Sequence, residues 1–303
     1  GTPAYNVGTS FSTPWVSRMA AELTHLVKEE FDPLLIRALL IHNAKYPANN
    51  SMSMTDKVTQ MGFGAPSSVQ EMLYNSEDEI TLILRDTLEK GSFIEMFDFP
   101  FPESLVDKDG NFVGQIIVTL VTKSLLDDKQ AGEYCQSNID ILFGTYETET
   151  DRDTSKKGIK NPKGLEEPQN ILLESLYSAR VKGAHPFTGF ERECTLVKYG
   201  KKFHPVKKYA IDLSEMTTSN RQRYLRGDRK WYLKIEGLYR DFIEQDARAR
   251  NYQLSQEYCL LLTIRDPNGK APVYDEVAQQ LDYKNFLHHN IQLRNVVTID
   301  GTL

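Results

Sequence analysis

The sequence predicts an α+β fold in which N-terminal helices are followed by a mostly antiparallel, jelly-roll-like β-sandwich. Up to about residue 75 the apolar residues recur with helical spacing, whereas after residue 75 they alternate with polar residues over short segments. Turn sequences separate seven or eight of these segments, and helical patterns do not alternate with them. This order favours an antiparallel sandwich over a βαβ sheet and divides the chain into two predicted domains, 1–75 and 76–303.

Two helices are predicted in the N-terminal part. The first follows Gly8-Thr9-Ser10, because Pro14 suits the first turn of a helix, where no backbone donor is needed. Its apolar residues fall on one stripe, which consists of Val16, Met19, Ala20, Leu23, Leu26 and Val27. A second apolar helix is predicted over residues 32–44, and the Gly-Phe-Gly-Ala-Pro sequence at 62–66 predicts a glycine-rich turn.

Short alternating segments in the C-terminal part predict strands. They are residues 79–86, 93–99, 112–121, 138–143, 193–199, 207–213, 230–239 and 257–264. Asp109-Gly110 predicts a hairpin turn, and a calcium loop is disfavoured because Val118 stands where such a loop needs glutamate. The remaining predictions are a turn at 266–269, a mobile charged loop at 147–168, and short helices at 170–180 and 273–281.

Composition limits the classes of partner and site. The net charge of -6 argues against a general affinity for nucleic acid, and no apolar run of about eighteen residues predicts a membrane span. The cysteines lack C-x-x-C spacing, which favours free buried thiols in a reducing, cytoplasmic compartment over one disulfide plus one free thiol; they are Cys135, Cys194 and Cys259. No cofactor is predicted, and no metal site, since adjacent His288 and His289 face different directions without ligand partners nearby.

Ser10 is the candidate catalytic residue, in the role of a nucleophile. Gly8 permits a close backbone approach, and the free N–H groups and positive dipole end of the following helix favour a developing oxyanion. By itself, Gly-Thr-Ser before a helix is also typical of an ordinary helix cap. Pro14 and Val16, four and six residues after the serine, together with the apolar stripe, favour the nucleophile.

Residues 8–16, Gly-Thr-Ser-Phe-Ser-Thr-Pro-Trp-Val, resemble the nucleophile motif of the subtilisin-like (S8) serine proteases, G-T-S-x-A-x-P-x-V. Residues 32–44 and 62–66 are similar to the next helix and glycine-rich turn of that family, so the resemblance extends to about residue 75. Two positions differ, because Ser12 replaces the usual alanine and Arg18 stands where the family has glycine. Kexin-like members carry a β-sandwich after the catalytic domain, and the arrangement here is similar.

The resemblance implies that residues 1–75 end a subtilisin-like α/β catalytic domain, and that the protein is a serine endopeptidase acting on peptides or proteins. Its net charge and hydropathy predict neither nucleic-acid nor membrane partners. The family places its Asp and His before the serine, yet neither residue type occurs before Ser10. His25 would lie roughly 22 Å along the helix, and His42 is expected to pack or cap. We therefore expect the C-terminal piece of a larger protease, obtained by expression or by cleavage before Gly1, and inactive alone.

Two further expectations concern surfaces. In the intact family fold a parallel sheet covers the serine helix, so in this piece residues 11–45 are expected to self-associate or to take a different arrangement. The alternative function is a non-catalytic β-sandwich interaction module of a degenerate protease, with Ser10 as a relic. The best candidate contact surface is a basic and aromatic cluster, diluted by Asp228 and Glu236, that comprises Arg221, Arg223, Tyr224, Arg226, Arg229, Lys230, Trp231 and Tyr232.

Overall fold

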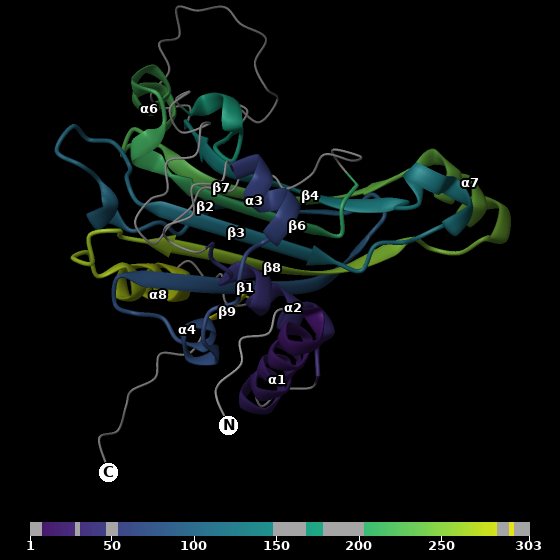
Figure 1. Ribbon diagram of the computed structural model, residues 1–303. Helices are drawn as coiled ribbons and strands as arrows, with labels where there is room; N and C mark the ends of the chain where they lie inside the picture. The colour runs from purple at the N-terminus through teal and green to yellow at the C-terminus, as the bar shows by residue number, and fades with distance from the viewer. Residues whose placement is uncertain are drawn as a thin grey trace, which may run out of the picture.

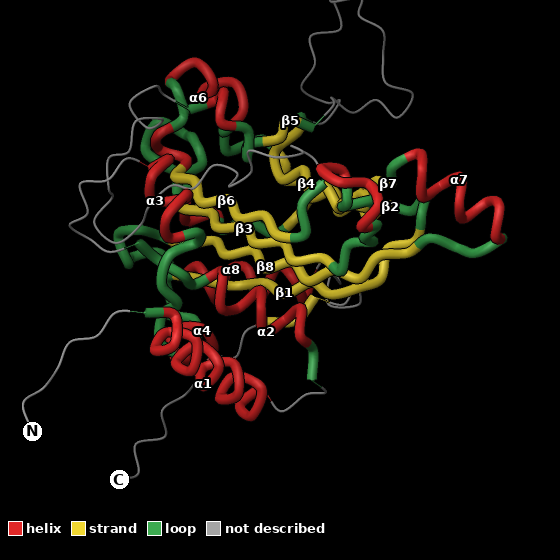
Figure 2. The backbone as a smooth tube through the Cα atoms, turned by 45° about the vertical axis from the view of Figure 1, so that its right-hand side comes forward, coloured by secondary structure: helices red, strands yellow, loops and turns green. Residues whose placement is uncertain are grey.

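The computed structural model describes residues 8–27, 31–46, 54–147, 168–177, 203–283 and 291–293. Within these residues the fold is α+β, as predicted, with N-terminal helices followed by two antiparallel sheets (Figure 1). Helices lie on the outer face of the first sheet, and the second sheet covers its inner face (Figure 2). The predicted boundary at residue 75 stays a prediction.

The N-terminal helices are α1 (Thr9–Val27), α2 (Pro33–His42), α3 (Met54–Met61) and α4 (Val69–Leu73). The helices predicted after Ser10 and over 32–44 are therefore confirmed, but α1 already begins at Thr9, so Pro14 lies inside the helix and not in its first turn as predicted. The start of α2 is fixed by Asp32, whose carboxylate accepts hydrogen bonds from the N–H groups of Leu34 at 2.8 Å and Leu35 at 3.2 Å. Pro33 follows as the first helical residue, where its missing N–H costs nothing.

The glycine-rich turn after α3 is also present. Gly62 and Gly64 have φ values of 58° and 91°, a region that residues with a side chain rarely adopt. A Cβ at Gly64 would lie 2.5 Å from the carbonyl oxygen of Lys45. The glycine thus lets residue 65 pair closely with the chain after α2, where the Ala65 N–H donates to the same carbonyl at 3.0 Å.

Two antiparallel sheets form the body of the molecule. The five-stranded sheet has the order β6-β3-β8-β1-β9, with β1 (Glu79–Glu89), β3 (Gln115–Thr122), β6 (Val206–Asp212), β8 (Ser255–Arg265) and β9 (Ile291–Leu293). The four-stranded sheet has the order β2-β7-β4-β5, with β2 (Phe93–Phe99), β4 (Ser137–Tyr146), β5 (Gln169–Asn170) and β7 (Lys230–Tyr239). Two of these strands, β2 and β7, match their predicted segments, and five more confirm predicted segments with boundaries that differ by a few residues.

Strand β8 is buried on both faces, which explains its nearly continuous apolar sequence. Leu260 and Leu262 belong to the core between the two sheets, whereas Cys259 and Leu261 belong to a second core beneath the helices. Burial continues into the neighbouring strand, since Leu82 of β1 is paired directly with Leu262 of β8 and both side chains are buried. The five-stranded sheet is therefore the central layer of the fold.

Several predictions of local structure are wrong or lie outside the described residues. The helix predicted over 170–180 is wrong, because β5 pairs with β4 and only a single 3-10 turn follows at Glu174–Leu176. A Cβ at Gly144 would lie 1.7 Å from the Gln169 carbonyl oxygen, so the absence of a side chain on β4 permits this approach. The strand predicted at 193–199 and nearly all of the loop at 147–168 lie outside the described residues.

Four helices were not predicted: α3 and α4 near the N-terminus, and α6 (Thr218–Tyr224) and α7 (Asp241–Arg250) in the C-terminal part. The omission of α6 and α7 has a structural reason. Helix α6 has no buried residue and α7 buries only Ala247, so neither carries an apolar stripe. Helix α8 (Val273–Tyr283), by contrast, buries Val273, Val277 and Leu281 and confirms the helix predicted at 273–281.

None of the described helices is long and apolar enough to cross a membrane. Further 3-10 turns are Glu103–Leu105, Asp128–Glu133 and Leu213–Glu215.

Cys135 and Cys259 are free and buried, as predicted, while Cys194 lies outside the described residues. Burial raises the pKa of the Cys259 thiol from its usual 9.0 to about 12, with the Asp32 carboxylate adding to the rise and Arg85 opposing it. The folded state therefore holds this thiol protonated. Because the pKa of Cys259 is higher in the folded than in the unfolded protein, its protonation contributes to folding stability fully below pH 9. This contribution to the free energy of unfolding is lost as the pH rises towards 12.

We expect Cys259 to resist alkylation by iodoacetamide at pH 8 in the native protein and to react fully in guanidinium chloride, because only the exposed thiolate is nucleophilic. Mass spectrometry of digested protein measures the modification at each cysteine separately. Rapid native modification of Cys259 would contradict the position of β8 between two cores.

Candidate functional site

Ser10 is the second residue of α1, and its side chain is exposed. The Gly8 carbonyl accepts a hydrogen bond from the N–H of Phe11 at 3.0 Å, which closes the first turn. The N–H groups of Thr9 and Ser10 lie in this turn, where a helix offers no acceptor of its own. Ser10 therefore combines an exposed side chain with a position at the positive end of a 19-residue helix.

The apolar stripe of α1 is only partly covered. Met19 and Leu23 are buried against α2, α4 and the outer face of the five-stranded sheet, below which α1 lies in Figure 2. Leu26 was predicted to belong to the buried stripe but is 39% exposed. Near Ser10, Phe11 is 60% and Trp15 is 49% exposed. A shallow hollow of about 400 Å³ lies along the same part of the helix, lined by Ser12, Thr13, Val16, Ser17 and Ala20.

None of the described histidines is placed to act as a base for Ser10. His25 is exposed in the last turn of α1, fifteen residues beyond the serine. His42 is buried at the end of α2, with Nδ1 2.9 Å from the Thr119 hydroxyl and Nε2 2.7 Å from the Thr263 hydroxyl, which confirms its predicted packing role. His204 precedes β6, where its N–H donates to the Asn138 side chain. The remaining three histidines lie outside the described residues: His185, His288 and His289.

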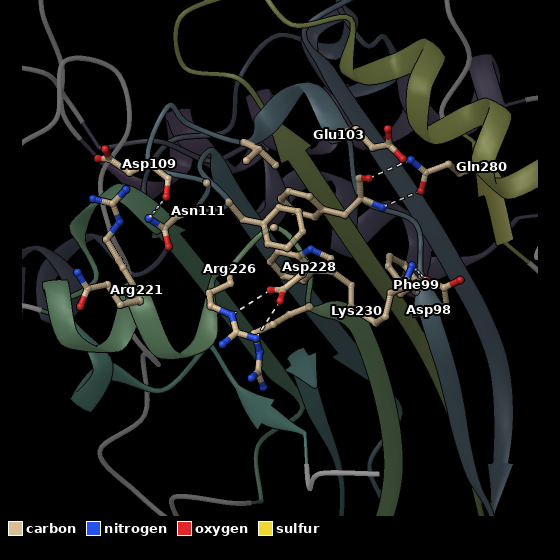
Figure 3. A pocket seen from close by; sticks show the side chains of 18 of the residues that line it. Asp98, Phe99, Glu103, Asp109, Asn111, Arg221, Arg226, Asp228, Lys230 and Gln280 are labelled. Carbon is tan, nitrogen blue, oxygen red and sulfur yellow. Dashed lines mark hydrogen bonds and ion pairs between the residues drawn. The ribbon is translucent and has the colours of Figure 1, made fainter. Parts of the chain in front are cut away.

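A second candidate site is a cavity of about 1260 Å³ at one end of the two sheets (Figure 3). Its walls come from the end of β2, the turn at 109–112, α6, the start of β7 and α8. Gln280 of α8 holds one wall by a paired contact with Phe101, accepting from its N–H at 3.2 Å and donating to its carbonyl at 3.0 Å. Figures 1 and 2 place α6 and α1 on opposite sides of the sheets, so this cavity is separate from the Ser10 helix.

The basic and aromatic cluster forms part of this cavity but is not the free cationic surface that its sequence suggests. Trp231 and Tyr232 are 2% exposed, and Arg229 is 3% exposed. Ion pairs neutralise the cations that line the cavity, namely Arg221 with Asp107, Arg226 with Asp228, Arg229 with Glu147, and Lys230 with Asp98. The Arg226 side chain lowers the pKa of Asp228 by donating hydrogen bonds to it. The cluster therefore offers little free positive charge to a nucleic acid.

The described residues contain no group of three or more His, Cys, Asp or Glu side chains that could hold a metal ion. The hydroxyl of Tyr232, which belongs to the basic and aromatic cluster, is unsuited to acid or base catalysis near pH 7. Burial raises its pKa, and the hydrogen bond it donates to Glu95 at 2.6 Å raises the pKa further. Of the described side chains considered so far, Ser10 therefore has the clearest nucleophile geometry.

Comparison with known families agrees with the motif around Ser10. Residues 4–67 match the model of the subtilase family, peptidase S8, and this segment includes Ser10, α1, α2 and the glycine-rich turn at 62–66. No curated protein matches the chain significantly. The N-terminal fifth of the chain is thus similar to subtilases, which supports a protease of this broad class.

Proposed function

We propose that the chain supplies Ser10 as the nucleophile of a subtilase-type serine endopeptidase that hydrolyses a peptide or protein. The observation that carries this proposal is the family match over residues 4–67, which includes Ser10. The exposed position of Ser10 in the first turn of α1 supports it. The histidine and aspartate belong to a segment that precedes Ser10 in the whole protein, following the order known for this family.

The reaction follows from these groups. Ser10 Oγ attacks the carbonyl carbon of the scissile peptide while the histidine takes its proton, and the backbone N–H of Ser10 helps to stabilise the oxyanion. The histidine then gives its proton to the leaving amine, which leaves an acyl ester on Ser10. Water, activated by the same histidine, hydrolyses the ester and restores the hydroxyl. Covalent labelling of the whole protein by a fluorophosphonate, with the modified residue mapped by mass spectrometry, tests this proposal.

The 303-residue chain by itself is expected to self-associate through the exposed face of α1. Phe11 and Trp15 are one helical turn apart and leave 60% and 49% of their surfaces exposed. Replacing both by serine should raise the dissociation constant of the oligomer at least about tenfold, or about 1.4 kcal/mol. Analytical ultracentrifugation measures the change. Phe242→Ser is the control, because Phe242 is 51% exposed but lies on α7; a chain that stays monomeric at all concentrations would exclude this interface.

The second candidate function is a non-catalytic interaction module made by the sandwich, with Ser10 as a relic. The cavity of about 1260 Å³ favours it, because this volume exceeds the roughly 300–1,000 Å³ typical of small-ligand pockets. Fluorophosphonate labelling distinguishes the two candidate functions, since only the protease hypothesis requires an activated serine.

A further inference from the structure

The cavity at the end of the sandwich has an excess of unpaired negative charge. Its four cations are each held by a carboxylate, as described above. Glu103 and Asp109 also line the cavity and are exposed, and neither forms an ion pair with a described residue. Figure 3 shows Glu103 on the side of Gln280 and Asp109 on the side of Arg221, so the two carboxylates flank the cavity from different elements. This arrangement attracts a cation.

Trp231 gives an independent indication of a ligand. It lines the cavity and is 2% exposed, yet its indole N–H has no acceptor among the described residues. Phe101 stacks on the indole with ring centroids 4.0 Å apart, Phe143 stacks at 5.1 Å, and Phe112 meets it edge-on at 5.3 Å. The ring faces are therefore occupied, and the buried indole N–H stays without an acceptor among the described residues. A buried donor without an acceptor is costly, so a carbonyl oxygen here would be stabilising.

A second orphan donor lies on the same cavity. The Nε of Arg221 is buried and has no hydrogen-bond partner in the described part of the chain, although another nitrogen of this guanidinium donates to Asp107. Trp231 comes from β7 and Arg221 from α6. The two elements thus present separate donors, which suits a ligand with more than one acceptor.

We propose that this cavity binds an extended peptide segment that carries a lysine or arginine side chain. Both donor atoms are buried, so side chains of the cavity wall move aside and let main-chain carbonyl oxygens of the peptide accept hydrogen bonds from Trp231 Nε1 and Arg221 Nε. The basic side chain lies between Glu103 and Asp109, whose charges no described cation neutralises. A simple anion fits less well, because it would satisfy the donors while adding repulsion from these two carboxylates.

The end of β2 forms part of the cavity wall. Asp98 has a φ of 52° at a bulge where the pairing of β2 with β7 shifts between Phe97 and Phe99. This irregularity places Asp98 3.5 Å from Lys230 on the cavity wall. Lys230 is thereby directed to a carboxylate of its own sheet, and the negative charge of Glu103 and Asp109 remains available to a ligand.

The proposal is independent of catalysis at Ser10, so its test uses the full 303-residue chain with Ser10→Ala. The probes are three fluorescent, end-blocked pentapeptides of alanine with a central lysine, norleucine or glutamate, followed by fluorescence anisotropy. We expect the lysine peptide to bind at least tenfold more tightly than the norleucine peptide and the glutamate peptide to bind most weakly. Equal binding of all three, no binding of the lysine peptide up to millimolar concentration, or its displacement by inorganic phosphate would overturn the proposal.

Matched variants locate the site. Glu103→Gln with Asp109→Asn should weaken the lysine peptide at least tenfold and leave the norleucine peptide unchanged. Trp231→Phe keeps the aromatic packing but removes the donor, and should weaken both peptides several-fold. Glu22→Gln is the control, because Glu22 is exposed on α1, away from the cavity. Circular dichroism and thermal unfolding verify that each variant is folded; a folded double variant that binds the lysine peptide normally would place the site elsewhere.

Discussion

Ser10→Ala is expected to abolish fluorophosphonate labelling of the whole protein and to lower its peptidase kcat by about 10⁶-fold, the loss typical of removing the nucleophile from a serine triad. The reason is that phosphonylation requires both the hydroxyl oxygen and a base that takes its proton. Labelling is measured on a gel, and the modified peptide, containing residues 8–16, is identified by mass spectrometry. Ser12→Ala is the matched control.

Ser12 is exposed two residues further along α1, and its hydroxyl is 3.4 Å from the Thr9 carbonyl oxygen. The Ser12→Ala substitution removes a hydroxyl close to Ser10 and leaves the nucleophile in place, so fluorophosphonate labelling should persist. The 303-residue chain alone should neither label nor turn over a peptide, because none of its described histidines is placed beside Ser10. Labelling that survives Ser10→Ala, or a whole protein that never labels, would disprove the assignment and favour the interaction module.

The strands were predictable where burial imposes a period of two or a continuous apolar run. Residues 93–99 match β2, and residues 257–264 lie within β8, whose two faces both meet apolar neighbours. Helices α6 and α7 could not be found in this way, because their stability does not depend on a buried stripe. In α7 the pair Arg250–Asp246, four residues apart, contributes surface charge pairing that hydrophobic periodicity ignores.

The cavity could not be predicted for a different reason. Its walls come from five segments spread between Asp98 and Tyr283, and no sequence spacing brings them together. The arginine cluster was visible, but its charge balance was not. Arg229 is neutralised by Glu147, which lies 82 residues away in the sequence and 2.8 Å away in the fold. Ser10 was predictable because its motif is local, whereas the partners of Arg229 depend on strand pairing.

The largest effect on stability is expected from His42, which joins α2 to the central sheet. Its two ring nitrogens contact hydroxyls on different strands, Thr119 on β3 and Thr263 on β8. The Thr263 hydroxyl is also 2.6 Å from that of Thr81 on β1, so one imidazole is connected to three strands. Two residues after His42, the Ala44 carbonyl accepts a hydrogen bond at 2.8 Å from the buried ammonium of Lys208. The end of α2 is thus held to the sheet by polar contacts as well as by apolar ones.

His42→Ala should lower the free energy of unfolding by about 2–4 kcal/mol, because it leaves a cavity and removes a buried hydrogen-bond partner from two hydroxyls. Denaturant unfolding followed by circular dichroism measures the change. His25→Ala, on the exposed side of α1, should stay within about 0.5 kcal/mol of the parent. A loss below 1 kcal/mol for His42→Ala would contradict the proposed coupling of α2 to the sheet.

The shape of the same unfolding curve tests the division at residue 75. Helices α1 and α2 share a core with β1, β3, β6 and β8, so a single transition that shifts as a whole in His42→Ala is expected. Two transitions, with only one displaced by the substitution, would mean that the helices and the sandwich unfold as separate domains. A single shared transition would instead mean that a ligand in the sandwich cavity, by stabilising the folded state, also stabilises the helix that presents Ser10.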